Sequence, residues 1–257
     1  MIYFVGAGPG AADLITMRGA RLLAEADVVV YAGSLVNPEL LDLCKSTCKI
    51  YDSSRMTLAQ IVEVLCDANA RGQTCVRLHT GDPALYGAHG EQMDELAKRG
   101  VPSCVVPGVS SLFGAAAALG VEYTVPEVSQ SVVVTRMEGR TPMPKGERLR
   151  DLASHDCTVV LFLSAGLLRE AQAELLAAGR SLREPAAIVV RATWPDEAIY
   201  PCTVGTLAEC AATHNVSKTA LVVVGQCLGA HVTRSLLYDA TFSHGYRTVA
   251  KRGGEDS

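Results

Sequence analysis

Apolar and amphipathic stretches alternate along the first half of the chain. The apolar runs are short and mostly unbroken, which is typical of strands buried on both faces of a parallel sheet. The expected strands are residues 2–5, 28–31, 49–51, 74–78 and 103–106. Apolar positions recur at helical spacing between them, and the expected helices are residues 17–26, 39–45, 58–71, 91–98 and 112–119. This alternation predicts an α/β domain built on an open parallel sheet.

A second series of elements follows an expected hinge at residues 120–127. Its strands are predicted at residues 131–136, 158–163, 186–192, 199–204 and 220–225, and its helices at residues 167–178 and 207–212. Pro201 cannot donate to a sheet ladder, so it favours an edge strand. We predict an N-terminal α/β domain at residues 1–119 and a C-terminal α/β domain at residues 120–240 with an edge strand at 236–242. A flexible tail is predicted at residues 241–257.

Composition and charge narrow the class of protein. Hydrophobic residues make up 49% of the chain, so a well-buried core is expected. We find neither an apolar run of the roughly 18 residues that a membrane span needs nor a signal peptide. The net charge of −4 argues against non-specific binding of nucleic acid. We therefore expect partners that are neither membranes nor nucleic acids.

The cysteines indicate a reducing compartment. There are nine, an odd number without the spacing of a disulfide framework, and we expect a cytoplasmic protein. Cys44 and Cys48 could share a helix face, but no further ligand follows at comparable spacing. We predict buried thiols and no metal site.

Loops rich in glycine or proline follow three of the expected strands, at residues 6–10, 81–87 and 107–111. The carboxyl ends of parallel strands meet at one sheet edge, where ligands of such sheets bind. We expect these turns, which carry few large side chains, to leave room for a ligand in a cleft between the domains. Two alternatives stay open, an ordinary strand-to-helix connection at Gly81-Asp82-Pro83 and plain helix capping by Ser110 and Ser111.

The first loop also matches a loose G-x-G-x-x-A dinucleotide pattern. Pro9 removes an amide where a pyrophosphate loop needs donors, and the helix begins only near Thr16. The acidic residue expected after the second strand is absent, because Ala32 and Gly33 stand there. A nicotinamide-dependent oxidoreductase is therefore the less favoured alternative, and a non-catalytic metabolite-binding subunit stays open.

Four motifs resemble the tetrapyrrole (class III) S-adenosylmethionine-dependent methyltransferases. They are Gly6-Ala7-Gly8-Pro9-Gly10, Asp13-Leu14-Ile15-Thr16, Gly81-Asp82-Pro83 and Pro107-Gly108-Val109-Ser110-Ser111. Each is weak alone, but the four in order are specific, and the resemblance covers about residues 1–230. It implies the tetrapyrrole methylase fold of two α/β domains, a homodimer, and S-adenosylmethionine as co-substrate in the cleft, with no metal held by the protein.

Further segments resemble the members that methylate a corrin precursor in cobalamin synthesis. They are residues 31–36, 79–87 with 91–93, 135–142 and 192–197. Residues 81–87 look more like the anaerobic-route members, whose corrinoid substrate carries cobalt. A metal-free substrate of the aerobic route and a sister methyltransferase of the corrin ring stay open.

The resemblance implies that the cofactor pocket is lined by Pro9, Gly81, Asp82, Tyr86, Ser110, Ser111, Leu163, Ala192 and Ala220. Methyl transfer from a sulfonium is an in-line displacement, so the protein mainly needs to align the methyl group and exclude water. Asp82 could instead cap a helix.

A corrinoid carries many carboxylates, so an acidic protein needs local cations to bind it. Arg136, Arg140 and Lys145 cluster with Arg148 around a loop rich in proline and glycine, and we predict that the first three bind substrate. A solvated charged loop is the alternative. C-methylation also leaves a proton to be lost.

The candidates for the acid–base group that handles this proton are His89 and Glu91, which follow the loop at residues 81–87. A lone histidine after a loop is more often structural or exposed, and this alternative stays open. Glu138 is a further candidate of the same kind.

Overall fold

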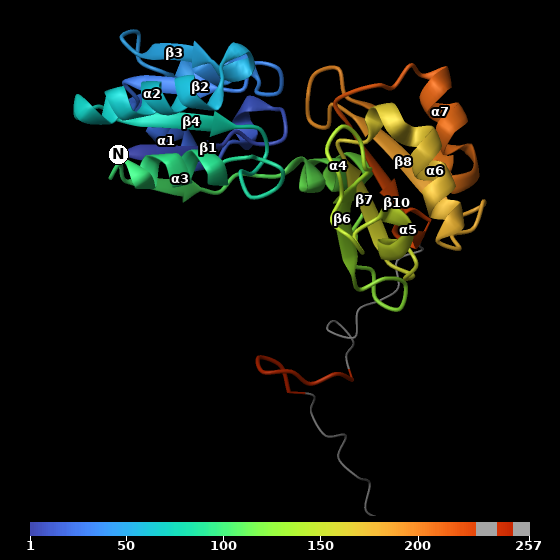
Figure 1. The fold of residues 1–257 in the computed structure, drawn as a ribbon. Helices are drawn as coiled ribbons and strands as arrows, with labels where there is room; N and C mark the ends of the chain where they lie inside the picture. Colours follow the sequence, from blue (N-terminus) through green and yellow to red (C-terminus); the bar gives the residue numbers. More distant parts are fainter. Residues whose placement is uncertain (230–240, 249–257) are drawn as a thin grey trace, which may run out of the picture.

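The N-terminal domain is a three-layer α/β unit. The computed structural model describes residues 1–229 and 241–248. Five parallel strands form the sheet in the order β3-β2-β4-β1-β5 (Figure 1). They are β1 (Ile2–Gly6), β2 (Val28–Tyr31), β3 (Lys49–Asp52), β4 (Cys75–His79) and β5 (Ser103–Val106). The predicted open parallel sheet is confirmed.

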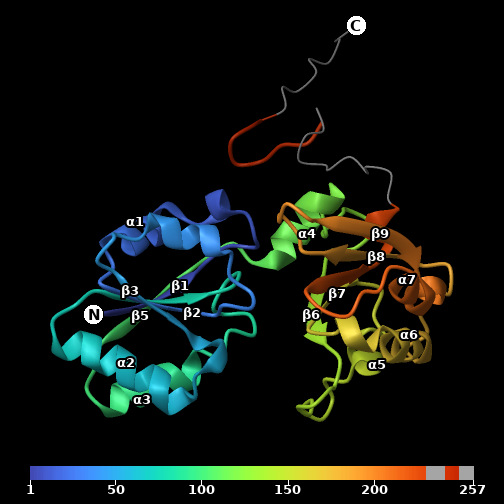
Figure 2. The same cartoon turned by 90° about the horizontal axis from the view of Figure 1, so that it is seen from above.

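Helices cover both faces of this sheet. α1 (Met17–Glu25) packs on one face, and α2 (Leu58–Ala70) and α3 (Gly90–Lys98) pack on the other (Figure 2). Local sequence starts these helices where we predicted. The hydroxyl of Thr16 accepts from an amide in the first turn of α1, and Thr57 forms a capping box at the start of α2.

The helix predicted at residues 39–45 is wrong in type, because this segment forms the 3-10 helix η2 (Pro38–Leu43). The Cys44 amide donates to the Leu41 carbonyl, three residues back, and a segment of six residues is too short to favour α-helix. The single α-helical turn α5 (Leu149–Leu152) was not predicted. The other 3-10 turns are η1 (Ala12–Leu14), η3 (Ser53–Arg55), η4 (Ala165–Leu167), η5 (Val204–Thr206) and η6 (Gln226–Leu228).

The C-terminal domain is built on a mixed sheet in the order β6-β7-β10-β8-β9. Its strands are β6 (Val132–Arg136), β7 (Thr158–Phe162), β8 (Pro185–Val190), β9 (Ala198–Thr203) and β10 (Ala220–Val224). Within this order β6 and β7 pair in parallel and the other neighbours pair antiparallel. The strand that contains Pro201 lies at the edge, as predicted.

The helices of this domain lie on both faces of its sheet. α5, α6 (Leu168–Ala177) and α7 (Leu207–Thr213) pack against one face. The other face is covered by α4 (Ser111–Leu119) and by Tyr123 and Val125, which follow it. In space the chain therefore passes to the second sheet before α4, although our predicted boundary lies after it (Figure 2).

Two predictions fall wholly or mainly outside the described residues, the edge strand at 236–242 and most of the tail at 241–257. No helix in the described part of the chain is long and apolar enough to cross a membrane. The same residues contain no group of three or more His, Cys, Asp or Glu side chains that could hold a metal ion.

Candidate functional site

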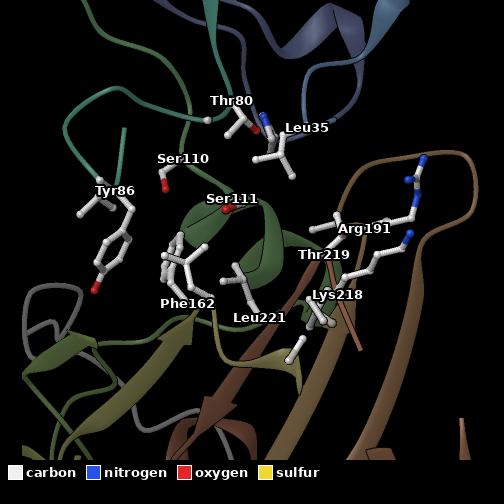
Figure 3. A pocket seen from close by; sticks show the side chains of 18 of the residues that line it. Leu35, Thr80, Tyr86, Ser110, Ser111, Phe162, Arg191, Lys218, Thr219 and Leu221 are labelled. Carbon is white, nitrogen blue, oxygen red and sulfur yellow. The ribbon is translucent and has the colours of Figure 1, made fainter. Parts of the chain in front are cut away.

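A cleft of about 570 Å³ lies where the carboxyl ends of the first sheet face the second domain (Figure 3). Its walls contain all nine residues that the sequence suggested for the cofactor, which are Pro9, Gly81, Asp82, Tyr86, Ser110, Ser111, Leu163, Ala192 and Ala220. The fold thus brings both halves of the chain to one cavity. The cofactor contacts themselves stay a prediction.

The first wall consists of three loops that pack directly on one another. Gly8 and Gly81 exchange backbone hydrogen bonds of 2.8 and 3.2 Å. A Cβ on Gly6 would lie 2.5 Å from the Cα of Gly108. The expectation that these turns leave room for a ligand is therefore wrong for Gly6 and Gly108, because the chain itself fills that space.

Gly81 differs from these glycines. Its φ is +60°, and a Cβ there would lie 3.5 Å from backbone atoms of Ser110 and Ser111, both of which line the cleft. Side chains rarely adopt this conformation, and glycine adopts it without strain. Because Gly81 has no side chain, only backbone atoms form this part of the cleft wall.

Asp82 connects two of the loops. One carboxylate oxygen accepts from the Ala84 amide and the other accepts from the Gly108 amide, each at 2.8 Å. Asp82 thus lines the cleft and also stabilises a local turn, but it does not cap α3, whose N-cap is His89. The helix-cap interpretation of Asp82 is therefore wrong, and its contact with the cofactor stays a prediction.

Ser110 is the N-cap of α4, with its hydroxyl accepting from the Leu112 amide at 3.2 Å. Ser111 begins the helix, and both serines also line the cleft. The capping alternative is therefore correct for Ser110 and does not exclude contact with a ligand.

Tyr86 reaches the second domain across the cleft. Its ring centroid lies 5.4 Å from that of Phe162 (Figure 3). Partial burial raises the pKa of the Tyr86 phenol, while the nearby Arg136 lowers it. The phenol is therefore neutral at physiological pH.

The second wall carries unusual backbone. Leu163, Arg191 and Thr193 have φ values of +50°, +49° and +69°. Leu163 directly follows β7, and Arg191 and Thr193 lie in the loop after β8; Leu163 and Arg191 line the cleft. Non-glycine residues in the left-handed region are uncommon and gather at functional sites. The strain supports the placement of a ligand site here.

Sequence reasoning did not assign site roles to Trp194 and Lys218, both of which line the cleft. Trp194 also joins the two domains, since a Cβ on Gly10 would lie 2.2 Å from its ring. Next to it, the Thr193 hydroxyl accepts from the Ala11 amide at 3.0 Å. The available signal was the only tryptophan of the chain, which follows an expected strand.

The predicted substrate-binding cations do not line this cleft. The Arg136 guanidinium donates to the carbonyls of Met137, Thr141 and Pro142 at 2.9–3.2 Å, so it holds its own loop. Arg140 and Lys145 are exposed on that loop. The predicted contact of Arg136, Arg140 and Lys145 with substrate stays a prediction.

His89 and Glu91 also lie outside the cleft lining. The Nδ1 atom of His89 is 2.9 Å from the Pro83 carbonyl oxygen, and its ring lies beside those of Phe4 and His79. Glu91 is exposed in the first turn of α3. These contacts of His89 are structural, and the acid–base role of His89 and Glu91 stays a prediction.

Comparisons with known proteins show which family the chain belongs to. Residues 1–208 match the family described as Tetrapyrrole (Corrin/Porphyrin) Methylases. The cobalt-precorrin-4 C(11)-methyltransferase of Methanocaldococcus jannaschii is 47% identical over 252 residues, which cover 98% of this chain and 97% of the relative.

Solved structures show the same fold. A cobalt precorrin-4 methyltransferase of cobalamin biosynthesis matches with a TM-score of 0.87 and 45% identity, covering 88% of this chain and 95% of its own. The uroporphyrin-III C-methyl transferase from Thermus thermophilus, complexed with S-adenyl homocysteine, matches with a TM-score of 0.74 and 33% identity. That match covers 88% of this chain and 92% of the other.

Proposed function

Because the chain belongs to the tetrapyrrole (corrin/porphyrin) methylases, we propose that it methylates cobalt-precorrin-4 at C-11 with S-adenosylmethionine. The product is then cobalt-precorrin-5A, an intermediate of anaerobic cobalamin synthesis. One observation carries this proposal, the 47% identity to a cobalt-precorrin-4 C(11)-methyltransferase over 98% of the chain.

The cleft suits S-adenosylmethionine in size and chemistry. Its volume of about 570 Å³ falls within the range of small-molecule sites. The Gly81 position keeps one wall free of a side chain, in a place where a Cβ would face the start of α4. The uroporphyrin-III relative was crystallised with S-adenyl homocysteine, the demethylated form of this donor.

The donor supplies an already activated methyl group on a sulfonium, so the protein's task is alignment and exclusion of water. Backbone of the first wall, around Gly81 and Ser110, would hold the donor. Side chains of Leu85, Phe162 and Leu221 supply apolar surface in the same cavity. Apolar walls limit access of water to the reacting carbon.

The compartment and the assembly of the protein are further proposals. All nine cysteines are free thiols, which supports a reducing compartment, and we place the protein in the cytoplasm. We also propose a homodimer, on the family resemblance alone. Sedimentation of the purified protein would test this assembly.

The function is tested by incubating the enzyme with S-adenosylmethionine and either cobalt-precorrin-4 or its metal-free counterpart. Mass spectrometry should show the addition of one methyl group to the cobalt form, and NMR should place it at C-11. Methylation at another ring carbon would identify a sister enzyme. Product from the metal-free form alone would indicate the aerobic route.

Calorimetry provides an independent check on the class of enzyme. We expect S-adenosylhomocysteine to bind and NAD not to bind. Tight binding of NAD without binding of S-adenosylhomocysteine would contradict the proposed reaction.

A further inference from the structure

Two cationic side chains stand together at the rim of the cleft. Arg191 directly follows β8, and Lys218 lies just before β10. The Arg191 amide donates to the Thr219 carbonyl at 2.9 Å, which places the two segments side by side. Figure 3 shows both side chains extending from this rim, across from Leu35.

The Arg191 side chain is held in place from two directions. Its Nε donates to Asp196 at 2.5 Å, and its guanidinium carbon lies 4.1 Å from the ring centroid of Trp194. The terminal nitrogens of Arg191 and the ammonium of Lys218 have no protein partner within the described part of the chain. Such a fixed fork is suited to a carboxylate, because little side-chain freedom is lost on binding.

Three charged residues line the cleft, Asp82, Arg191 and Lys218. Arg191 forms an ion pair with Asp196, whereas Lys218 has no ion pair within the described part of the chain. Both oxygens of Asp82 already accept from backbone amides, and Asp196 engages only the Nε side of the Arg191 fork. The terminal nitrogens of Arg191 and the ammonium of Lys218 are therefore available to an anion at this rim, although the chain as a whole has a net charge of −4.

We propose that Arg191 and Lys218 bind a peripheral carboxylate of the macrocyclic substrate and so set its orientation against the methyl donor. This inference rests on the proposed function. A second hollow, of about 210 Å³, adjoins the same two side chains and is lined by Tyr200 and His214. It offers space for an acidic side chain of a macrocycle that lies at the rim of the cleft, beside the bound methyl donor.

The test compares Lys218→Glu and Lys218→Gln with the wild type. We expect Lys218→Glu to raise the KM for the corrin substrate about tenfold and Lys218→Gln about threefold. The affinity for S-adenosylhomocysteine, measured by calorimetry, should stay unchanged. Arg169→Gln is the matched control, since Arg169 is an exposed cation of the same domain outside the cleft lining.

A binding assay without turnover separates this inference from the proposed function. Quenching of Trp194, the only tryptophan, reports binding of uroporphyrin III, a polycarboxylate tetrapyrrole. Lys218→Glu should weaken this binding about tenfold, even if the wild type methylates no corrin precursor. That combination of results would reject the proposed reaction and leave the role of Lys218 in carboxylate binding supported.

Three outcomes would overturn the inference. One is an unchanged KM and porphyrin affinity in both Lys218 variants. Another is a parallel loss of S-adenosylhomocysteine affinity, which would assign these cations to the donor's own carboxylate. The third is a loss seen with Arg140→Gln and not with Lys218→Glu, which would return substrate binding to the loop of Arg136.

Discussion

Gly81 shows how much one position can contribute to the cleft. Its backbone is in the left-handed region, it is bonded to Gly8, and a side chain there would face Ser110 and Ser111. Any substitution thus combines backbone strain with a change in the cleft wall. The two effects can be separated experimentally, because other glycines, such as Gly100, have a positive φ but lie away from the cleft wall.

We predict that Gly81→Ala weakens binding of S-adenosylhomocysteine at least about tenfold and destabilises the fold by about 1 kcal/mol. Gly100→Ala is the control, since Gly100 has a φ of +67° with open space around it. It should show the same loss of stability and normal binding. Calorimetry and urea unfolding measure the two quantities, and equal affinities in the two variants would remove the 81–87 loop from the site.

At the scale of elements, buried polar side chains of β4 and α3 support the 81–87 loop. They are Arg77 and His79 of β4 and Gln92 of α3. Arg77 donates to the Gln92 side chain at 3.0 Å, and Gln92 donates to the Ala88 carbonyl at 3.1 Å. Near the other end of this loop, the His89 ring contacts the Pro83 carbonyl. Side chains from β4 and α3 therefore position the loop that carries Tyr86 into the cleft.

His79 belongs to the same group, and it makes stability depend on pH. Burial, together with the nearby Arg77 and His89, lowers the pKa of His79 to about 3. The unfolded chain takes up a proton near pH 6.5 that the folded chain excludes. The free energy of unfolding should therefore fall as the pH drops from about 6.5 toward 3, by at most about 1.4 kcal/mol per pH unit from this group.

Urea unfolding at about pH 7 and about pH 5 measures this effect. Between about pH 7 and about pH 5 the His79→Leu variant should lose less stability than the wild type, because it has no protonatable side chain at position 79. His155→Gln, at an exposed position, should keep the wild-type dependence. A wild-type slope in His79→Leu would show that other groups control the acid sensitivity.

At the scale of the whole molecule, a few close contacts join the two domains around the cleft. The Trp194 ring packs on Gly10, the Thr193 hydroxyl accepts from Ala11, and Tyr86 approaches Phe162. These contacts determine the separation of the cleft walls. A change at the joint should therefore affect binding even without direct contact with the ligand.

We predict that Gly10→Ala displaces the indole, because its Cβ would lie 2.2 Å from the Trp194 ring. The free energy of unfolding should fall by about 1–3 kcal/mol, the tryptophan emission should shift, and S-adenosylhomocysteine should bind more weakly. Gly90→Ala, which meets nothing within 4 Å, should behave as the wild type. An unchanged emission spectrum in Gly10→Ala would contradict this joint.

The sequence by itself determined the order and type of nearly every element, because strand patterns, helix caps at Thr16 and Thr57, and the edge proline Pro201 act through neighbouring residues. It also pointed to the nine residues that now line one cleft, through motifs specific to a family. The exceptions were short segments such as η2 and α5, where local preferences are too weak to choose between helix types.

Tertiary structure alone decided which cations face the cleft and whether the space beside each glycine is filled by the chain or open to a ligand. Arg136 ends β6 and Arg191 follows β8, but Arg136 donates to its own loop and Arg191 lines the cavity. Likewise, Gly6 and Gly108 accommodate each other rather than a ligand. The reason is physical, since the direction of a side chain and the space beside a backbone depend on how the segments pack in three dimensions, and Gly6 and Gly108 meet although they are far apart in the chain.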